Sequence, residues 1–314
     1  MSMQPLNHAP VMLDEVIQHL NINPDGVYVD GTYGRGGHAQ SILKQLGAKG
    51  RLIVMDKDPQ AIKAARLAMG DDGRVSIFHD DFSQLTKQLI AMGLLNEVDG
   101  VLLDLGVSSP QLDDASRGFS FQKNGPLDMR MNPLQGKSAA EWLRHADEKE
   151  ISTVLWELGE ERFSRRIARK IVETRQVQDI EDTKTLSDLI CGCVPQPRNK
   201  KHPATRSFQA IRIHVNQELT DIGRFLDSIF DILKIGGRLL IISFHSLEDR
   251  LVKRFFRFHS SKSKIPRGLP IRDKDLLSNI RLQLIGKVIR AGALELSLNP
   301  RARSAVLRVA ERTA

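Results

Sequence analysis

Four short apolar segments in the N-terminal third, each followed by an aspartate, constrain the fold of this chain more than any other feature. The segments are apolar throughout, and amphipathic stretches with helical spacing separate them. Strands of this kind are buried on both faces, as in a parallel sheet that helices cover on either side. The sequence therefore predicts an α/β fold with strands at 27–30, 52–56, 75–78 and 101–104.

The middle of the chain has a different pattern. Apolar residues in 139–192 recur at helical spacing, and no strand pattern is found there. A long helix is expected at 207–233, and buried strands are expected at 238–243 and 305–309. A helical insertion thus interrupts the sheet, which then resumes. The expected division is a discontinuous main domain, 1–116 and 208–314, and an inserted helical domain, 117–207.

The aspartates that end the four segments are expected along one edge of the sheet. In parallel α/β sheets this edge, beyond the carboxyl ends of the strands, is where ligands bind. A glycine-rich loop, 31–37, joins the first strand to the first helix, and glycine lets the backbone turn sharply against a ligand. Asp56 lies 22 residues after Gly34, where a carboxylate can accept both hydroxyls of an adenosine ribose. The four aspartates are Asp30, Asp56, Asp80 and Asp104.

Asp30 discriminates between two adenosine-containing ligands. The pyrophosphate of a dinucleotide needs donors and positive potential at this loop, and a carboxylate opposes it. S-adenosylmethionine carries an ammonium and a sulfonium but no phosphate, so Asp30 and Asp104 attract it. Phe82 is placed either to pack on the adenine or to serve as an ordinary core aromatic. The charges favour S-adenosylmethionine over NAD.

The loop after the fourth strand suits chemistry at an amino group. The exocyclic amino group of a nucleobase donates its lone pair into the ring, so it is a poor nucleophile. Two hydrogen-bond acceptors pull it towards a tetrahedral geometry, and the methyl group must be held about 3 to 3.5 Å away. The acceptors expected here come from Asp104, Ser108 and Ser109, held rigid by Pro110. A turn capped by serine and proline is the alternative interpretation.

The two cysteines, Cys191 and Cys193, argue against two other chemistries. Methylation at carbon 5 of a pyrimidine needs a cysteine nucleophile at the ligand edge, but both cysteines fall in the helical insertion. No further cysteine or histidine stands near them at ligand spacing. We therefore expect two ordinary thiols and no metal site.

The chain is basic, with a net charge of +8 and an isoelectric point near 9.6. This balance favours a polyanionic partner such as nucleic acid. Basic side chains can take phosphates while aromatic rings stack on bases, although any single basic run is also typical of a solvated face. The basic runs are 253–258 with Lys262, Lys264 and Arg267, then 199–206, and Arg301 with Arg303.

No signal peptide or membrane span is visible in the sequence. The first residues lack a basic segment followed by an apolar stretch. No apolar run approaches the roughly 18 residues that a membrane span requires. We expect a cytoplasmic protein without a membrane partner, and a monomer and a dimer are both compatible with these features.

Seven motifs spread over nearly the whole chain resemble one family, the bacterial 16S ribosomal RNA cytosine-N(4)-methyltransferases. They are DGTYGRGGH at 30–38, LLDLGVSSPQLD at 102–113, RGFSF at 117–121, PLDMRM at 126–131, HPATRSFQA at 202–210, SFHSLEDR at 243–250 and NPRARS at 299–304.

This resemblance implies a Rossmann-like, S-adenosylmethionine-dependent methyltransferase sheet, with the insertion 117–207 as a substrate-recognition domain. It implies S-adenosylmethionine as the methyl donor and a cytidine in the decoding centre of 16S rRNA as the acceptor, within the small ribosomal subunit or its late assembly particle. His245 either lines the cleft or caps the next helix. Carried over by motif, the cofactor contacts are Gly36, Gly37, His38, Asp56, Phe82, Asp104 and Gln111.

Two other functions compete with this one. An NAD-linked oxidoreductase could use the same sheet and would bind NADH but not S-adenosylhomocysteine. A non-enzymatic RNA-binding ribosome assembly factor would carry a decayed cofactor cleft. The intact Gly36, Gly37, Asp56 and Asp104 argue against such decay.

Overall fold

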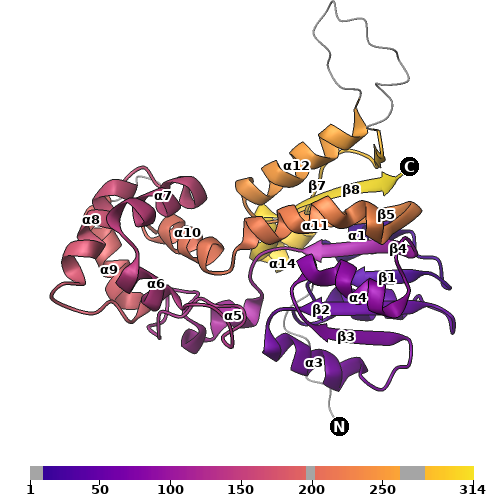
Figure 1. Cartoon of the computed structure of the whole chain (residues 1–314), viewed down its shortest axis with the longest axis horizontal. Coiled ribbons are helices and arrows are strands. Elements are labelled where there is room, and N and C mark those ends of the chain that lie inside the picture. The colour runs from indigo at the N-terminus through magenta and orange to yellow at the C-terminus, as the bar shows by residue number, and fades with distance from the viewer. Residues whose placement is uncertain (1–9, 196–201, 262–279) are drawn as a thin grey trace, which may run out of the picture. The chain divides into compact units, whose positions relative to one another are not determined.

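The computed structural model describes residues 10–195, 202–261 and 280–314 (Figure 1). The chain forms two compact units. The first unit comprises Met1–Gly106 and Leu219–Ala314, and the second comprises Val107–Glu218.

The unit boundaries differ from the expected ones at 117 and 207. The second unit begins ten residues earlier because Val107 and Leu112 pack against its core. It ends eleven residues later because α10 (Thr205–Val215) contributes Phe208 and Ile211 to that same core.

A mixed sheet forms the centre of the first unit. Among the described residues it has eight strands, in the order β3-β2-β1-β4-β5-β8-β6, and β7 pairs with β8. Strands β1 to β5 are parallel, whereas β8 runs antiparallel to β5. The strands are β1 (Val27–Asp30), β2 (Arg51–Asp56), β3 (Val75–His79), β4 (Val98–Asp104), β5 (Leu233–Ser243), β6 (Leu282–Leu284), β7 (Ile289–Arg290) and β8 (Val306–Arg312).

The α/β fold and the four N-terminal strands expected from the sequence are confirmed. β1 has the predicted bounds, and β2 to β4 end at or within one residue of theirs. The sequence did not indicate β6 or β7, because segments of three and two residues are too short to show a period.

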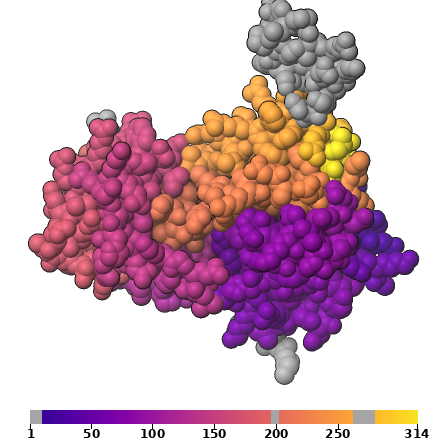
Figure 2. All heavy atoms as spheres, in the orientation of Figure 1, coloured from indigo at the N-terminus to yellow at the C-terminus, as the bar shows by residue number. Residues whose placement is uncertain are grey.

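Helices cover both faces of this sheet, as all-apolar strands require. Side chains of α1 (Leu13–Leu20), α2 (Gly37–Leu43) and α3 (Pro59–Met69) share one core with one face of the sheet. Those of α4 (Leu85–Met92), α11 (Glu218–Ile232) and α12 (Ser246–Ser260) share a second core with the other face. In Figures 1 and 2 the orange C-terminal helices lie directly against the violet N-terminal segments, so both ends of the sequence build this unit.

Within its described residues, the second unit contains helices and one isolated β-bridge, Pro126–Asp182. Its core is formed by apolar faces of these helices. Besides α10, the helices are α5 (Ser109–Asp113), α6 (Ala139–His145), α7 (Glu148–Gly159), α8 (Ser164–Thr174) and α9 (Thr183–Cys193).

The single helix expected at 207–233 is wrong, because the structure divides it into α10 and α11. The Asn216 amide donates to Met129 O (2.7 Å) and to Arg212 O (2.9 Å), and its oxygen accepts from Met131 N (2.7 Å). Gln217 then takes a left-handed conformation, with φ 53°. These contacts stop α10, although the apolar spacing continues through the break.

None of the helices in the described ranges combines the length and hydrophobicity that a membrane span requires.

Candidate active site

The glycine-rich loop after β1 is folded tightly against the sheet. Gly31 N donates to Leu102 O (3.0 Å), and Gly34 N donates to Asp56 Oδ2 (2.8 Å). Gly36 has φ +77°, and a Cβ there would lie 2.3 Å from the Tyr33 hydroxyl. A side chain at this position would be strained by its backbone conformation and would also displace the tyrosine.

Asp56, at the end of β2, lies at the edge of this loop. Its two oxygens accept from Gly34 N and Asp58 N, both at 2.8 Å. A carboxylate has about four acceptor positions, so two are left for the paired hydroxyls of a ribose. Burial raises the pKa of Asp56 to about 6, against the opposing effect of the two backbone hydrogen bonds. The carboxylate is therefore ionised above neutral pH.

Asp30, His38 and Asp104 gather on the other side of the loop. Asp30 is 1% exposed, and burial raises its pKa to about 6 although His38 opposes this shift. His38 is 5% exposed, and its Nε2 lies 3.6 Å from Asp104 Oδ2. Burial by itself lowers the pKa of His38, but the Asp104 carboxylate and then Asp30 and Glu295 hold it above its ordinary value.

This group carries polar atoms that a ligand would satisfy. In the described part of the chain, no hydrogen-bond partner is found for either ring nitrogen of His38 or for Oδ1 of Asp104. Buried polar atoms without partners are costly, and so are ionised carboxylates held close together. A ligand that brings both positive charge and polar atoms relieves both costs. The residues therefore fit S-adenosylmethionine, as the sequence predicts.

Phe82 lies in a short 3-10 turn after β3 and is largely buried. Its ring meets Phe225 edge to face, with centroids 5.8 Å apart. The core position anticipated as an alternative is thus observed, and contact with an adenine remains a prediction.

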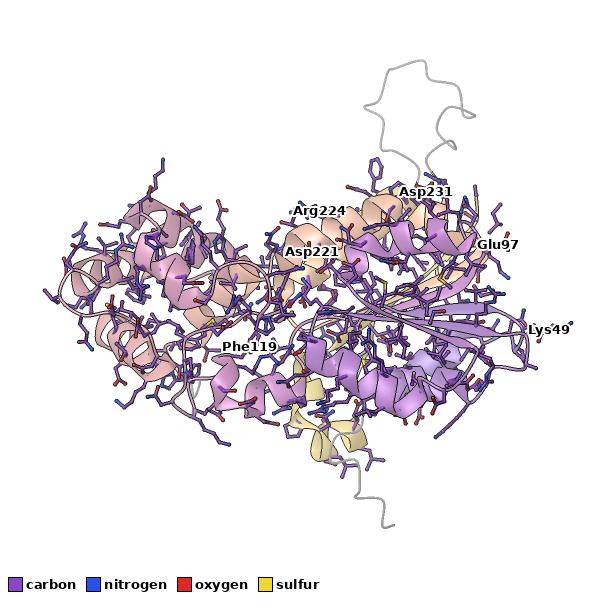
Figure 3. All side chains as sticks on the ribbon, turned by 60° about the horizontal axis from the view of Figure 1, so that its bottom comes forward. Lys49, Glu97, Phe119, Asp221, Arg224 and Asp231 are labelled. Atoms are coloured by element: carbon purple, nitrogen blue, oxygen red, sulfur yellow. The ribbon has the colours of Figure 1, made fainter. Side chains whose placement is uncertain are left out.

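Lys57 was not predicted from the sequence, and it connects three segments at the edge of the sheet. Its ammonium lies 2.6 Å from Asp81 Oδ2 and 2.8 Å from Asp221 Oδ2. Arg224 lies 3.6 Å from the other oxygen of Asp221, one turn along α11 (Figure 3). Burial by itself lowers the pKa of Lys57, but the two carboxylates raise it above its ordinary value. Lys57 thus joins the segment that carries Asp56 to the loop after β3 and to α11.

Asp104 ends β4 in the first unit, and its backbone N donates to Thr32 Oγ1 (2.6 Å). The other predicted residues of this loop belong to the second unit, where they form the start of α5. Ser108 is the N-cap residue, and the Gln111 side chain accepts from Ser108 N (2.9 Å), which completes a capping box. Ser108 and Gln111 thus have a structural role in the cap, as the interpretation of a capped turn predicts. The role of this loop as a source of hydrogen-bond acceptors stays a prediction.

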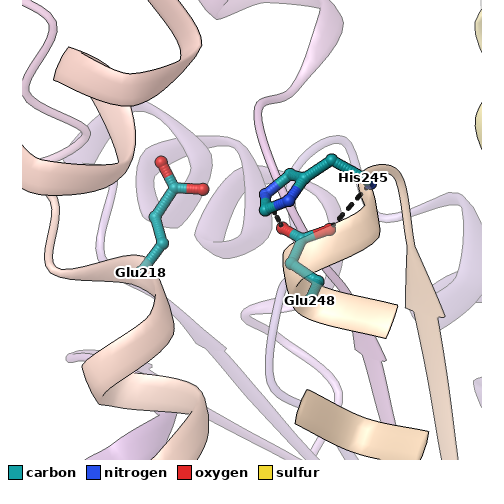
Figure 4. Close-up of side chains that lie close together, drawn as sticks. All are labelled: Glu218, His245 and Glu248. Atoms are coloured by element: carbon teal, nitrogen blue, oxygen red, sulfur yellow. Dashed lines mark hydrogen bonds and ion pairs between the residues drawn. The ribbon is translucent and has the colours of Figure 1, made fainter. Parts of the chain in front are cut away.

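His245 occupies the N-cap position of α12, as the capping interpretation predicts. Its Nε2 lies 3.0 Å from Oε1 of the fully buried Glu248 (Figure 4). The other oxygen of Glu248 accepts from Phe244 N (2.8 Å) and His245 N (3.3 Å). The capping position of His245 is thus observed, and its place in the cleft stays a prediction.

The model of the MraW methylase family matches residues 5–313 of the chain. The chain belongs to this family. It is 55% identical over 307 residues to the ribosomal RNA small subunit methyltransferase H of Thioalkalivibrio sulfidiphilus, a match that covers 98% of either protein.

Solved structures resemble the chain only weakly. An rRNA methylase from Streptococcus thermophilus is 12% identical, with 100% of this chain and 99% of that one covered and a TM-score of 0.40. A SAM-dependent methyltransferase from Aquifex aeolicus is 10% identical, with coverages of 98% and 93% and a TM-score of 0.39. Similarity at this level is too low to bear on function.

Family membership decides between the functions that the sequence left open. The chain is an S-adenosylmethionine-dependent methyltransferase, as expected from its motifs. The NAD-linked oxidoreductase and the non-enzymatic assembly factor are therefore wrong.

Proposed function

We propose that the chain methylates the exocyclic 4-amino group of a cytidine in the decoding centre of 16S rRNA, with S-adenosylmethionine as the donor. The observation that carries this proposal is the acidic edge around the glycine loop, where Asp30, His38 and Asp104 present charge and unpartnered polar atoms to a cationic ligand. The 55% identity to a ribosomal RNA small subunit methyltransferase supports the choice of acceptor.

In this proposal the residues of the loop hold the cofactor. Asp56 accepts the ribose hydroxyls, and Phe82 bounds the adenine. The remaining contacts are assigned to the methionine portion and come from Gly36, Gly37, His38, Asp104 and Gln111. When bound, the cofactor supplies an electrophilic methyl group on a positively charged sulfur.

The chain's own task is to make the amino group nucleophilic. We assign Asp104 and Ser109 as the two acceptors that bind the N–H groups of the cytosine and draw its lone pair out of the ring. Ser108 and Pro110 position them, because Ser108 caps α5 and Pro110 stiffens its first turn. Placement of the amino group at about 3 to 3.5 Å from the methyl carbon then accounts for much of the rate. This chemistry needs no metal.

The assignment of partners follows from the same proposal. The second unit is assigned to recognition of the small ribosomal subunit or its late assembly particle, and the enzyme works in the cytoplasm, where that particle is built. Transfer of a labelled methyl group to small-subunit particles, followed by nuclease mapping of the modified base, tests it. Label on the N4 of one cytidine is expected, whereas label on another base or none at all contradicts the proposal.

Replacement of Asp56 is expected to weaken cofactor binding. Asp56→Ala removes two charge-assisted hydrogen bonds to the ribose, so the affinity for S-adenosylmethionine falls by about 1–3 kcal/mol in calorimetry. Asp56→Asn retains one acceptor oxygen and is expected to lose less. Unchanged affinity in both variants would remove Asp56 from the site.

The same carboxylate predicts a pH dependence. Because the pKa of Asp56 is about 6, the ionised acceptor is lost as the pH falls through that value. The affinity for S-adenosylmethionine is thus expected to be highest above pH 7 and to decline towards pH 5. In Asp56→Asn this decline should be smaller than in the wild type.

One basic run predicted from the sequence lies on the outer face of α12. Lys253, Arg254 and Arg257 are exposed there, whereas Phe256 is buried and Phe255 packs on Phe230. Of the three aromatic residues in this run, Phe256 is buried and so cannot stack on a base, whereas Phe258 is largely exposed. Lys262, Lys264, Arg267 and residues 199–201 lie outside the described residues.

Neutralising this face is expected to change the salt dependence of RNA binding. If Lys253, Arg254 and Arg257 each contact a phosphate, the triple glutamine variant should flatten the slope of log affinity against log salt by about two to three units. Filter binding to a 16S rRNA fragment over a range of salt concentrations measures this. An unaltered slope in a folded variant would mean that the run is only a solvated face.

A further inference from the structure

A basic face runs along α8 in the second unit. Between Arg162 and Val172 the sequence has five basic residues and no acidic residue. All five side chains are exposed. We call them the α8 basic face, and its members are Arg162, Arg165, Arg166, Arg169 and Lys170.

The helical repeat places these cations opposite the core. Ile167, Ala168 and Ile171 are buried and pack into the core of the second unit. At about 100° per residue, the four cations within α8 fall inside an arc of about 140° on the other side of the helix. Arg162 lies in the turn that leads into α8. The α8 basic face is thus continuous.

Among the described residues, few acidic side chains neutralise the charge of the α8 basic face. Arg169 lies 3.7 Å from Glu148 and Lys170 lies 3.9 Å from Glu173, and the four side chains are between 44% and 69% exposed. Such surface pairs contribute little. For the guanidinium groups of Arg162, Arg165 and Arg166, no ion pair or hydrogen bond is found with any residue that the structure describes.

The α8 basic face also differs in charge from the rest of the second unit. Residues 107–218 hold 18 basic and 16 acidic residues, so the unit as a whole is nearly neutral. The segment 147–161, which includes α7, has six acidic residues and one lysine, and the α8 basic face follows it directly in the sequence. Solubility alone is served by mixed charges. Separation of the two signs instead creates a local positive field.

We propose that the α8 basic face binds the phosphate backbone of RNA. Arginine supplies four of its five cations, and the guanidinium fork matches the oxygens of a phosphate in a bidentate way. No exposed large apolar side chain lies between Arg162 and Lys170. A protein partner needs such anchors at the centre of its interface, whereas a repeating polyanion does not. This inference rests on the proposed function, to which it adds a named contact surface.

The test compares two triple variants that lose the same charge. Arg162→Gln/Arg165→Gln/Arg166→Gln removes part of the α8 basic face, and glutamine keeps a similar helix propensity. The matched control replaces three exposed lysines elsewhere in the second unit by glutamine: Lys123, Lys137 and Lys149. Thermal unfolding followed by circular dichroism verifies that both variants are folded.

Binding to a 16S rRNA fragment is measured from low to high salt. For three lost phosphate contacts, the slope of log affinity against log salt is expected to flatten by about two to three units in the α8 variant. Its affinity at low salt should fall about tenfold or more, and the control should change by less than one slope unit. An unchanged slope in the folded α8 variant, or an equal change in the control, overturns the assignment.

Competition identifies the kind of partner. Polyglutamate at equal charge concentration is expected to displace the RNA poorly, and equally good displacement by polyglutamate overturns the assignment to RNA. Methyl transfer by the wild type to small-subunit particles decides the proposed function separately. If transfer occurs without the slope effect, the α8 assignment alone fails. If the slope effect occurs without transfer, the α8 assignment stands and the proposed acceptor fails.

Discussion

Asp104→Asn and Ser109→Ala are each expected to slow methyl transfer by about 10²–10³ in single turnover, by analogy with the loss of one donor from an oxyanion hole. In the proposed mechanism, each variant removes an acceptor from the amino group. Asp104→Asn should also weaken binding of S-adenosylmethionine, because the lost charge no longer complements a cationic ligand. Ser109→Ala should leave that binding nearly intact, since its proposed partner is the nucleobase.

Single-turnover rates and calorimetry on the same two variants separate these effects. Normal rates in both would exclude the loop after β4 from catalysis. The wild-type rate at saturating cofactor should vary little between about pH 7 and 9, because the proton can leave after methyl transfer, when the new ammonium-like nitrogen is strongly acidic. A bell-shaped profile that disappears in His245→Ala would instead make His245 a general base.

Asp30→Asn is expected to stabilise the fold while it weakens the cofactor site. Asparagine keeps the acceptor for Thr32 N, which Asp30 Oδ1 binds at 3.1 Å, but it removes a buried negative charge. Burial is the main cause of the raised pKa of Asp30, about 6 against 3.8, so ionisation costs the folded state up to about 3 kcal/mol. We expect the free energy of unfolding to rise by about 1–3 kcal/mol at pH 8.

The sign of this effect sets its pH dependence. Between about pH 4 and 6 the folded wild type keeps a proton that the unfolded chain has lost, so the stability of the wild type falls as the pH rises. The advantage of Asp30→Asn should therefore be absent near pH 4 and complete above pH 7 in denaturant titrations. A variant that is less stable than the wild type at pH 8 would contradict this account.

Cofactor binding provides the second readout for Asp30→Asn. The affinity for S-adenosylmethionine should fall by about 1–2 kcal/mol, because a carboxylate near a cation is lost. S-adenosylhomocysteine lacks the sulfonium charge, so its affinity should fall less. Equal losses of affinity for the two ligands would mean that the Asp30 carboxylate does not interact with the sulfonium charge.

Local patterns in the sequence were enough for the framework of the first unit. All-apolar segments ending at Asp30, Asp56 and Asp104 predicted parallel strands, and the structure places these residues at the carboxyl ends of β1, β2 and β4. The glycine-rich loop could also be identified, because its conformation depends on residues that are neighbours in the chain. Burial on both faces and the strand–helix alternation act over a few residues, so they leave a period in the sequence.

Contacts between distant segments decided the rest. Lys57 meets Asp221 across 164 positions, and no local signal marks that pair. Asn216 ends α10 through the backbone of Met129 and Met131, although the apolar spacing predicted an uninterrupted helix. A side chain forms such hydrogen bonds and ion pairs only after folding has brought its partner close. The strands and the aspartates at their carboxyl ends were therefore determined by the sequence pattern, whereas the partners of the buried polar groups and the limits of the two units were decided by tertiary packing.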